Sequence, residues 1–426
     1  MKNIILMLCM MMMVAAAKFA APQSTTGVAS TDLSATALSI AAARKAISDK
    51  PMEYSGYNLL ATALIRRAQE TSDASFYTQA EDAIKKSLQI APKNFDAEKI
   101  KVSVLLGEHE YPAALESATI LNKRVPDDLM VYGLLTDANV ELGNYEDAEV
   151  AAQWMLNLRP GNLPALTRAA RLRELFGDTE GAYELMEMAY ESTPSTEIEE
   201  RARVLTQMGY LRLTSGSTEA AERLFRQALT AFPNYPAALG NLAQVRITQT
   251  RYDEAVAMLE QRYRGVPRTE NLYDLAEALL LAGRDAEAKK TFADFETKAL
   301  AESLRKVNSN RELIFYYADH AHRPGNALDI ANQEYAWRHD VYTLDAYAWA
   351  LHVNGQDAEA RKQIETALAV GIRDSKIFAH AGEIALKLGD RAAAENYLQE
   401  AVSLHAIGLE HAQLVLAQLP RPHAQR

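Results

Sequence analysis

The stretch from Leu129 to Asn162, LMVYGLLTDANVELGNYEDAEVAAQWMLNLRPGN, decides the fold of this chain because its pattern recurs along the sequence at a spacing equal to its own length. In its first half the apolar and small residues are spaced as on one face of a helix, and Gly143 stands where that helix would end. In its second half Ala148 and Met155 belong to another helical stripe, and Pro160 would end the second helix. The stretch therefore predicts two helices that pack closely through the small Ala148.

The same spacing is found along most of the chain. Pro126, Pro160 and Pro194 follow one another at equal intervals. The next such proline, Pro233, comes later than this interval predicts, so about five extra residues within 196–202 should lengthen the helix that follows. A small residue recurs at the position of Ala148 in the other units, as Ala80, Ala114, Ala182, Ala221, Ala255, Ala288, Ala327, Ala360 and Ala394.

This pattern resembles the tetratricopeptide repeat, whose signature W-x2-L-G-x2-Y, A-x3-F and P has the same period of about 34 residues. Tyr132, Thr136 and Asn139 occupy the positions of its Trp, Gly and Tyr, so the spacing is matched more fully than the residue types. The resemblance implies an all-α fold, a right-handed α-solenoid of about ten helix-turn-helix units in which each unit packs only against its neighbours. It also implies that ligands lie in the concave groove, against the first helix of each unit.

The order of segments follows from this register. The expected segments are a cleaved signal peptide at 1–17, a flexible leader at 18–31, an N-terminal capping helix at 32–52, two parts of the array at 53–306 and 307–407, and a C-terminal capping helix with a tail at 408–426. The array is divided because the second helix of the unit that begins near Thr269 has no closing proline and is expected to continue to about Lys306. This irregular joint motivates the hypothesis of a hinge, which small-angle scattering fitted by one rigid superhelix would refute.

The first residues indicate export. Lys2 precedes an apolar stretch from Ile4 to Ala17 that ends in small residues, as in a secretory signal peptide. The stretch is shorter than the ~20 residues that a membrane-spanning helix needs, so membrane contact should be limited to the transient signal peptide. Cys9 is the only cysteine, which excludes disulfides and thiolate sites from the mature chain. We expect a periplasmic or secreted protein.

Composition narrows the class of partner. The sequence has 45 Lys and Arg residues against 56 Asp and Glu residues, a formal net charge of −11. A phosphate backbone would be repelled, so we expect no nucleic acid. A basic segment would be attracted. We therefore predict a protein or peptide partner with net positive charge.

No catalytic arrangement is apparent in the sequence. The chain has no phosphate-binding glycine-rich loop, no nucleophile elbow and no HExxH motif. His320 and His322 have a spacing that could suit a metal, but the end of a helix explains them better and no third histidine is near. We predict no enzyme activity, no catalytic residues, no cofactor and no metal site.

The family's groove positions give a candidate binding surface. In the family, ligands contact positions 2, 5, 9, 12 and 13 of the first helices, and here these positions form a polar surface of mixed charge with one aromatic cluster late in the array. The candidate binding residues are Asp137, Glu141, Arg171, Tyr210, Gln244, Asp345, Trp349, His352 and Glu383.

Trp349 has two interpretations. By register it stands one turn from Asp345 and close to His352, where its large ring would make a platform for a peptide or a glycan. Alternatively it packs into the preceding unit as part of the core. The quenching of its fluorescence by acrylamide would separate the two.

The sequence thus predicts a non-catalytic exported scaffold or adaptor that holds a peptide segment or a protein surface in its concave groove. An alternative from another class is an accessory protein for glycan handling in the cell envelope, such as polysaccharide export or uptake. The aromatic residues that would support this alternative are Trp349, Tyr342, Tyr347 and Tyr210.

Overall fold

The computed structural model describes residues 35–71, 73–303, 310–404 and 416, and within these ranges the chain forms α-helices, one short π-helix and no strand. The predicted signal peptide at 1–17 and leader at 18–31 lie outside the described residues, and so does the segment 408–426 apart from Leu416. Among the helices in these ranges, none combines the length and the hydropathy needed to cross a membrane.

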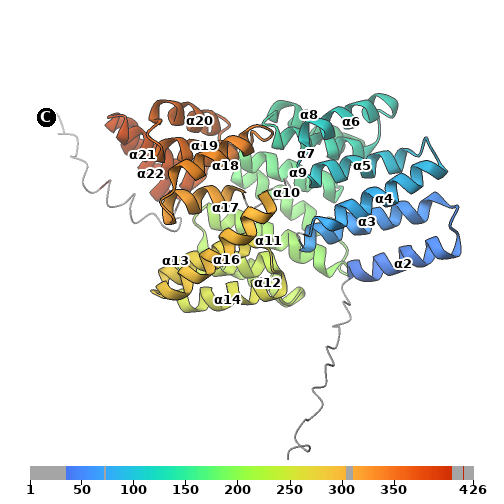
Figure 1. Cartoon of the computed structure of the whole chain (residues 1–426), viewed down its shortest axis with the longest axis horizontal. Coiled ribbons are helices and arrows are strands. Elements are labelled where there is room, and N and C mark those ends of the chain that lie inside the picture. The colour runs from blue at the N-terminus through green and yellow to red at the C-terminus, as the bar shows by residue number, and fades with distance from the viewer. Residues whose placement is uncertain (1–34, 72, 304–309, 405–415, 417–426) are drawn as a thin grey trace, which may run out of the picture.

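After the capping helix α2 (Ala35–Asp49), the helices form ten consecutive pairs (Figure 1). The first helices of the pairs are α3 (Tyr54–Thr71), α5 (Phe95–Gly107), α7 (Leu129–Glu141), α9 (Leu163–Leu175), α11 (Ile198–Thr214), α13 (Pro236–Thr248), α15 (Thr269–Leu281), α17 (Asn310–Phe315), α19 (Val341–Val353) and α21 (Ser375–Lys387). The second helices are α4 (Ser75–Ile90), α6 (Tyr111–Arg124), α8 (Tyr145–Leu158), α10 (Thr179–Ser192), α12 (Thr218–Ala231), α14 (Tyr252–Gly265), α16 (Asp285–Ser303), α18 (Pro324–Tyr335), α20 (Asp357–Ala369) and α22 (Arg391–Ser403). These pairs confirm the predicted all-α solenoid of about ten units.

The unit boundaries are set by helix caps. Side-chain oxygens of Asn94, Asp128 and Asn162, which follow one another at the repeat interval, each accept a hydrogen bond from the backbone N–H three positions further on. Helix α11 has 17 residues where α7 and α9 have 13. The extra residues predicted within 196–202 therefore do lengthen this helix.

The core is divided among the units, as expected for a repeat array. The ten alanines at the position of Ala148, one in each second helix, are completely buried. Complete burial shows that the space around each alanine is filled, so a larger side chain at this position would push the helices apart. The recurring alanine is thus confirmed as a core position of each unit.

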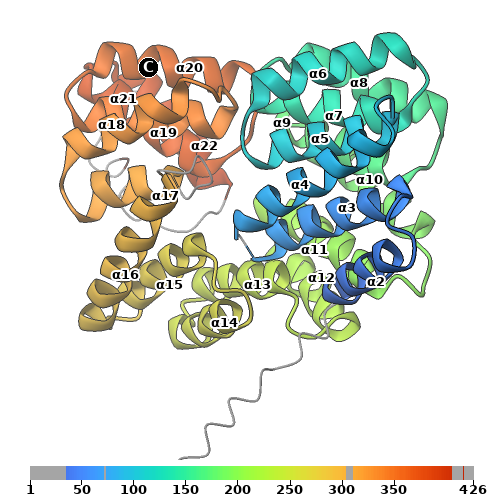
Figure 2. The ribbon, with the colours of Figure 1, turned by 45° about the vertical axis from the view of Figure 1, so that its right-hand side comes forward.

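The array curls until its C-terminal units meet its middle units (Figure 2). Helices α18 to α21 lie beside α7 to α9 in both ribbon views. The N–H of His339 donates to the carbonyl oxygen of Glu141 over 2.9 Å, and the N–H of Val341 donates to the hydroxyl of Tyr145 over 2.9 Å. One apolar cluster also joins side chains of α8 and α9 to side chains of α19, α20 and α21.

We call this contact the closure interface. It is formed by residues 141–145 and 171–177 on one side and by residues 338–342 and 371–377 on the other. The expectation that each unit packs only against its neighbours is wrong here, because the superhelix bends far enough for distant units to touch. The result is a ring with an interior.

Two loop glycines permit the close approach at this interface. A Cβ atom on Gly143 would lie 2.8 Å from the carbonyl oxygen of His339, and one on Gly177 would overlap with the carbonyl oxygen of Gly371. Gly143 and Gly177 have φ angles of +75° and +78°. Gly283 has a similar φ of +70°, but a Cβ there would meet nothing within 4 Å. Gly283 is therefore needed only for the conformation of its turn. Gly143 and Gly177 are needed both for a turn and for close packing at the closure interface.

The joint between α16 and α17 departs from the regular pattern. Helix α16 has 19 residues and ends at Ser303. Helix α17 has only six residues and continues as the π-helix η1 (Tyr316–His320). Residues 304–309 lie outside the described part of the chain, so the hinge hypothesis stays a prediction.

Candidate binding sites inside the ring

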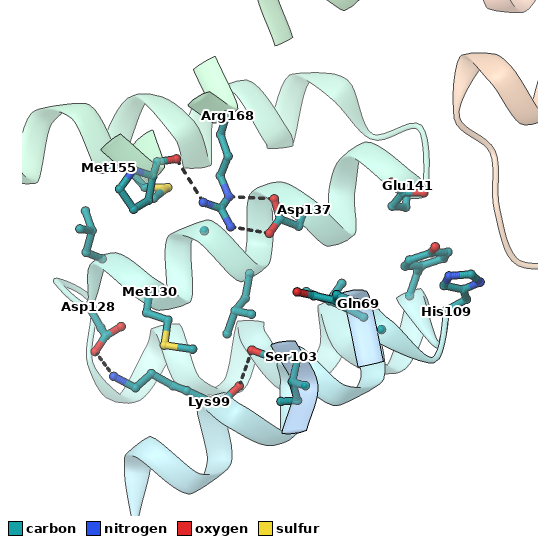
Figure 3. Close-up of a pocket in the computed structure, with 18 of the residues that line it drawn as sticks. Gln69, Lys99, Ser103, His109, Asp128, Met130, Asp137, Glu141, Met155 and Arg168 are labelled. Atoms are coloured by element: carbon teal, nitrogen blue, oxygen red, sulfur yellow. Dashed lines mark hydrogen bonds and ion pairs between the residues drawn. The ribbon is translucent and has the colours of Figure 1, made fainter. Parts of the chain in front are cut away.

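The first helices of the N-terminal units form a groove (Figure 3). Helices α3, α5, α7 and α9 line most of it, and its volume is about 790 Å³, which is within the range of ligand pockets. Leu106, Leu134 and Met155 give it an apolar lining, and Gln69 and Ser103 add uncharged polar groups. We call this space the N-terminal groove.

Two cations of the N-terminal groove, Lys99 and Arg168, are held in ion pairs between neighbouring units. The Nζ of Lys99 lies 2.8 Å from Oδ2 of Asp128, and Arg168 binds both carboxylate oxygens of Asp137 at 2.8 and 2.6 Å, as Figure 3 shows. Burial lowers the pKa of Lys99, but hydrogen bonds to Asp128 and Asp96 outweigh it and the net shift is upward. Lys99 therefore stays charged, and the groove combines an apolar lining with charges that are largely neutralised from within.

A second space, the central cavity, lies in the interior of the ring. It has a volume of about 520 Å³, and its lining comes from both sides of the closure interface. Glu141 and Arg338 line both this cavity and the N-terminal groove, so the two spaces adjoin. Four predicted binding residues from four separate units meet in the central cavity, namely Glu141, Arg171, Tyr210 and Asp345.

Arg338 links the two sides of the closure interface electrostatically. Its Nε lies 2.6 Å from Oε2 of Glu141 and 3.1 Å from Oδ2 of Asp340. Burial raises the pKa of Glu141, although the charge of Arg338 opposes the shift. The pair therefore carries a desolvation cost, which the attraction between the two charges opposes.

Two guanidinium groups share one aromatic ring in the central cavity. Arg171 and Arg311 lie 5.2 and 5.3 Å from the centre of the Tyr342 ring, a cation–π arrangement. Arg171 also pairs with Glu174 at 2.9 Å, whereas Arg311 is 3.7 Å from Glu312. The lining as a whole holds four cations and six carboxylates, so the cavity is net acidic.

The other predicted polar residues lie apart from the central cavity. Asp137 lines the N-terminal groove. His352 is engaged with Asp357, with 2.6 Å between its Nδ1 and the carboxylate Oδ1. Gln244 and Glu383 are half-buried, and neither they nor His352 line either of the two spaces.

Trp349 belongs to the hydrophobic core. Its side chain is 9% exposed, its Nε1 donates to Oδ1 of Asp319 over 2.7 Å, and its ring stacks on His380 with 4.2 Å between centroids. His380 also lies 2.7 Å from Oδ1 of Asp345 through its Nδ1. Of the two interpretations of Trp349, the structure agrees with core packing.

Several residues of the central cavity were missed by the sequence reasoning. Arg311 and Arg338 fall in the divergent unit at 308–340, where the register is hardest to assign, and Asp374 was placed at a unit boundary. The one signal was the divergence itself: this unit keeps Ala327 but has Pro324 and Gly325 near the turn. Its Arg338 supplies a contact across the closure interface.

The described ranges contain no group of three or more His, Cys, Asp or Glu side chains that could hold a metal ion. The Nε2 of His320 contacts the carboxylate of Glu277, and its ring stacks on Phe292 with 4.5 Å between ring centroids. These contacts give His320 a packing role at the end of η1.

Comparison with protein families agrees with the helix pairs. Residues 212–262 and residues 375–405 each match a model of the tetratricopeptide repeat. The chain is a tetratricopeptide repeat protein. No curated protein sequence matches this tetratricopeptide repeat protein.

Solved structures with a similar chain path include three from different organisms. A human IFIT1 dimer with PPP-AAAA is 13% identical, with 86% of this chain and 94% of that chain covered and a TM-score of 0.46. Yeast Tom70 is 13% identical, with 89% and 90% covered and a TM-score of 0.40. A tetratricopeptide repeat protein from Parabacteroides merdae is 17% identical, with 60% and 97% covered and a TM-score of 0.36. At these levels the likeness assigns no ligand to the present protein.

Proposed function

We propose that this tetratricopeptide array is a non-catalytic scaffold that holds a peptide segment or a protein surface in its N-terminal groove. The observation that carries the proposal is the groove itself, in which first helices of four consecutive units present apolar and uncharged polar side chains around about 790 Å³. Stacked repeats use such concave surfaces to bind extended partners.

The dimensions suit a short extended segment. Three spacings of about 10 Å separate four packed helices, so the groove from α3 to α9 is about 30 Å long. An extended chain advances about 3.3 Å per residue, which gives a bound segment of about nine residues. Alternate side chains of that segment would face Leu106, Leu134 and Met155.

The segment that we propose carries a net positive charge. The whole chain has a net charge of −11, and the groove adjoins a central cavity with more carboxylates than cations. The Asp137 side chain is 39% exposed beside Arg168, so its oxygens can accept further hydrogen bonds. Such an attraction speeds association and weakens with salt.

The test is the capture of peptides from a library of nine-residue sequences. Ser103→Trp would fill the groove, and Thr230→Trp would place the same side chain on the exposed face of α12 as a matched control. We expect the wild type and Thr230→Trp to enrich peptides that contain Lys or Arg, and Ser103→Trp to bind them at least tenfold more weakly, a loss of about 1.4 kcal/mol. Equal binding by the two Trp variants would exclude the groove, and binding that is unchanged by added salt would exclude the proposed charge.

Export is part of the proposal and rests on the sequence. Residues 1–17 have the pattern of a secretory signal peptide, and a mature chain without cysteine suits an oxidising compartment. Alkaline phosphatase fused behind residues 1–40 should be active, because this enzyme needs export to form its disulfides. The same fusion without residues 1–17 should be inactive, and equal activity of the two would contradict export.

A further inference from the structure

The outer side of the array carries another recess, formed by α6, α7 and α8. Its volume is about 410 Å³, and none of its lining residues is shared with the N-terminal groove or the central cavity. We call this recess the outer pocket. It is large enough for a small ligand.

An exposed tryptophan forms one wall of the outer pocket. Trp154 is 46% exposed, and its ring lies nearly parallel to that of Tyr132, with an angle of 14° and 5.9 Å between centroids. The same register position in the units before and after is also exposed and apolar, as Ile120 and Met188. Unlike Ile120 and Met188, Trp154 presents a flat aromatic wall, and it does so beside polar side chains.

Polar groups with unused hydrogen-bonding capacity line the same pocket. The Nδ2 of Asn122 is buried and has no hydrogen-bond partner among the described residues. The carboxylate of Asp147 is exposed and forms no ion pair or hydrogen bond within the described part of the chain. A buried donor without a partner costs about 1–3 kcal/mol, and a ligand that accepts its hydrogen bond would remove that cost.

We propose that the outer pocket binds a neutral oligosaccharide. A sugar ring presents a face of C–H groups, which can pack on the Trp154 ring, and a rim of hydroxyl groups, each of which both donates and accepts. One hydroxyl accepts from Nδ2 of Asn122 once this amide turns from its buried position into the pocket, and another donates to the carboxylate of Asp147. An aromatic wall beside unsatisfied polar groups is the chemistry that such a ligand complements.

Other occupants satisfy the pocket less well. An apolar protein surface would cover Trp154 and Val150 but would leave Asn122 and Asp147 desolvated without partners, which is unfavourable. An acidic sugar would meet Asp147, and no Lys or Arg lines the pocket to offset the repulsion. The inference does not depend on the N-terminal groove, and it does not use Trp349, which is in the core.

Titration calorimetry with defined trisaccharides tests this inference. The probes are cellotriose, maltotriose and tri-N-acetylchitotriose, with trigalacturonic acid as the acidic comparison. We expect the full chain to bind at least one neutral trisaccharide and not the acidic one. Trp154→Ala should abolish binding, whereas Met188→Ala, which removes the equivalent exposed side chain of the next unit, should bind as the wild type does.

Asn122→Leu tests the proposed hydrogen bond to the sugar. Loss of the amide should weaken trisaccharide binding at least tenfold, while the circular dichroism spectrum stays that of the wild type. Trisaccharide binding by Asn122→Leu that is as tight as in the wild type would overturn the proposed hydrogen bond. Unchanged binding by Trp154→Ala, or no heat from any neutral trisaccharide at about 10 mM, well above ordinary ligand affinities, would overturn the site itself.

Discussion

Two kinds of interface hold this array together, and they depend on different features of the sequence. Neighbouring units pack through a periodic set of residues, such as the buried alanines and the caps that recur at the repeat interval. The closure interface joins residues as much as 197 positions apart, and it depends on single side chains such as Arg338 and on the loop glycines Gly143 and Gly177. Stability is spread evenly over the first kind of interface and concentrated in a few residues of the second.

Arg338→Ala should have the largest effect, because it removes the cation that Glu141, Asp340 and Glu334 share. Three carboxylates would remain at a partly buried interface without their cation. We expect the free energy of unfolding to fall by about 3–5 kcal/mol. The matched control is Arg212→Ala, which breaks the neighbouring-unit pair with the exposed Glu180 and should cost about 1 kcal/mol or less. Urea titrations followed by circular dichroism give both values, and equal losses would contradict the distinction between the interfaces.

Gly177→Ala and Gly283→Ala should differ although both glycines have positive φ. Each alanine should lower the free energy of unfolding by about 1–2 kcal/mol, because a residue with a Cβ is strained in the left-handed conformation. At Gly177 the new Cβ also collides with the carbonyl of Gly371, which should add about 1–3 kcal/mol and loosen the ring, whereas at Gly283 it meets nothing. Small-angle X-ray scattering should show a larger radius of gyration for Gly177→Ala alone, and the same radius for both variants would count against closure.

Asp374→Asn should have the smallest effect and a distinctive pH dependence. Burial raises the pKa of Asp374, so the folded state holds this proton more firmly than the unfolded chain does, and ionisation at neutral pH works against folding. Asn can still cap α21 but cannot ionise. The variant should be more stable than the wild type at pH 7 by up to about 1 kcal/mol.

That advantage should shrink as the pH falls through the folded-state pKa of Asp374 and vanish below about pH 4, near the ordinary pKa of aspartate. Thermal melts at a series of pH values measure the difference. A variant that is less stable than the wild type at pH 7, or a difference that grows on acidification, would show that the carboxylate is not penalised by the ring.

The contrast between the interfaces also explains what the sequence could reveal. The position of Ala148 recurs, so its burial in all ten units was predictable, as was the longer α11. Gly143 and Gly283 look alike in the sequence because both end a first helix, and only the bend of the whole array brings His339 against Gly143. The repeat period relates each residue to its counterpart in the next unit, whereas closure depends on the rotation accumulated over many units.

The candidate site could also be predicted only in part from the sequence. Glu141, Arg171, Tyr210 and Asp345 were placed on the inner face because the register of the first helices fixes that face. The cavity that these four residues share, and the role of Arg338, could not be predicted from the sequence, because both depend on the closure interface. The location of Trp349 could not be predicted either. The unit before it is divergent, so the repeat register did not decide whether Trp349 faces the interior of the ring or packs in the core, where the structure places it.

The most direct test of the closed ring is a disulfide across the closure interface. In a Cys9→Ser chain, Gly143→Cys and His339→Cys would place their Cβ atoms about 3.5 Å apart, at the lower end of the range that a disulfide spans. The closed ring predicts an oxidised monomer with this cross-link, seen as faster migration on a non-reducing gel and as a linked peptide by mass spectrometry. The control pair Gly283→Cys and His339→Cys should stay reduced. Because the new Cβ of Gly143→Cys also crowds the carbonyl oxygen of His339, the reduced variant must first show the wild-type radius of gyration in small-angle scattering. If such a variant cross-links no more than the control pair, the ring is open in solution and the closure interface does not form.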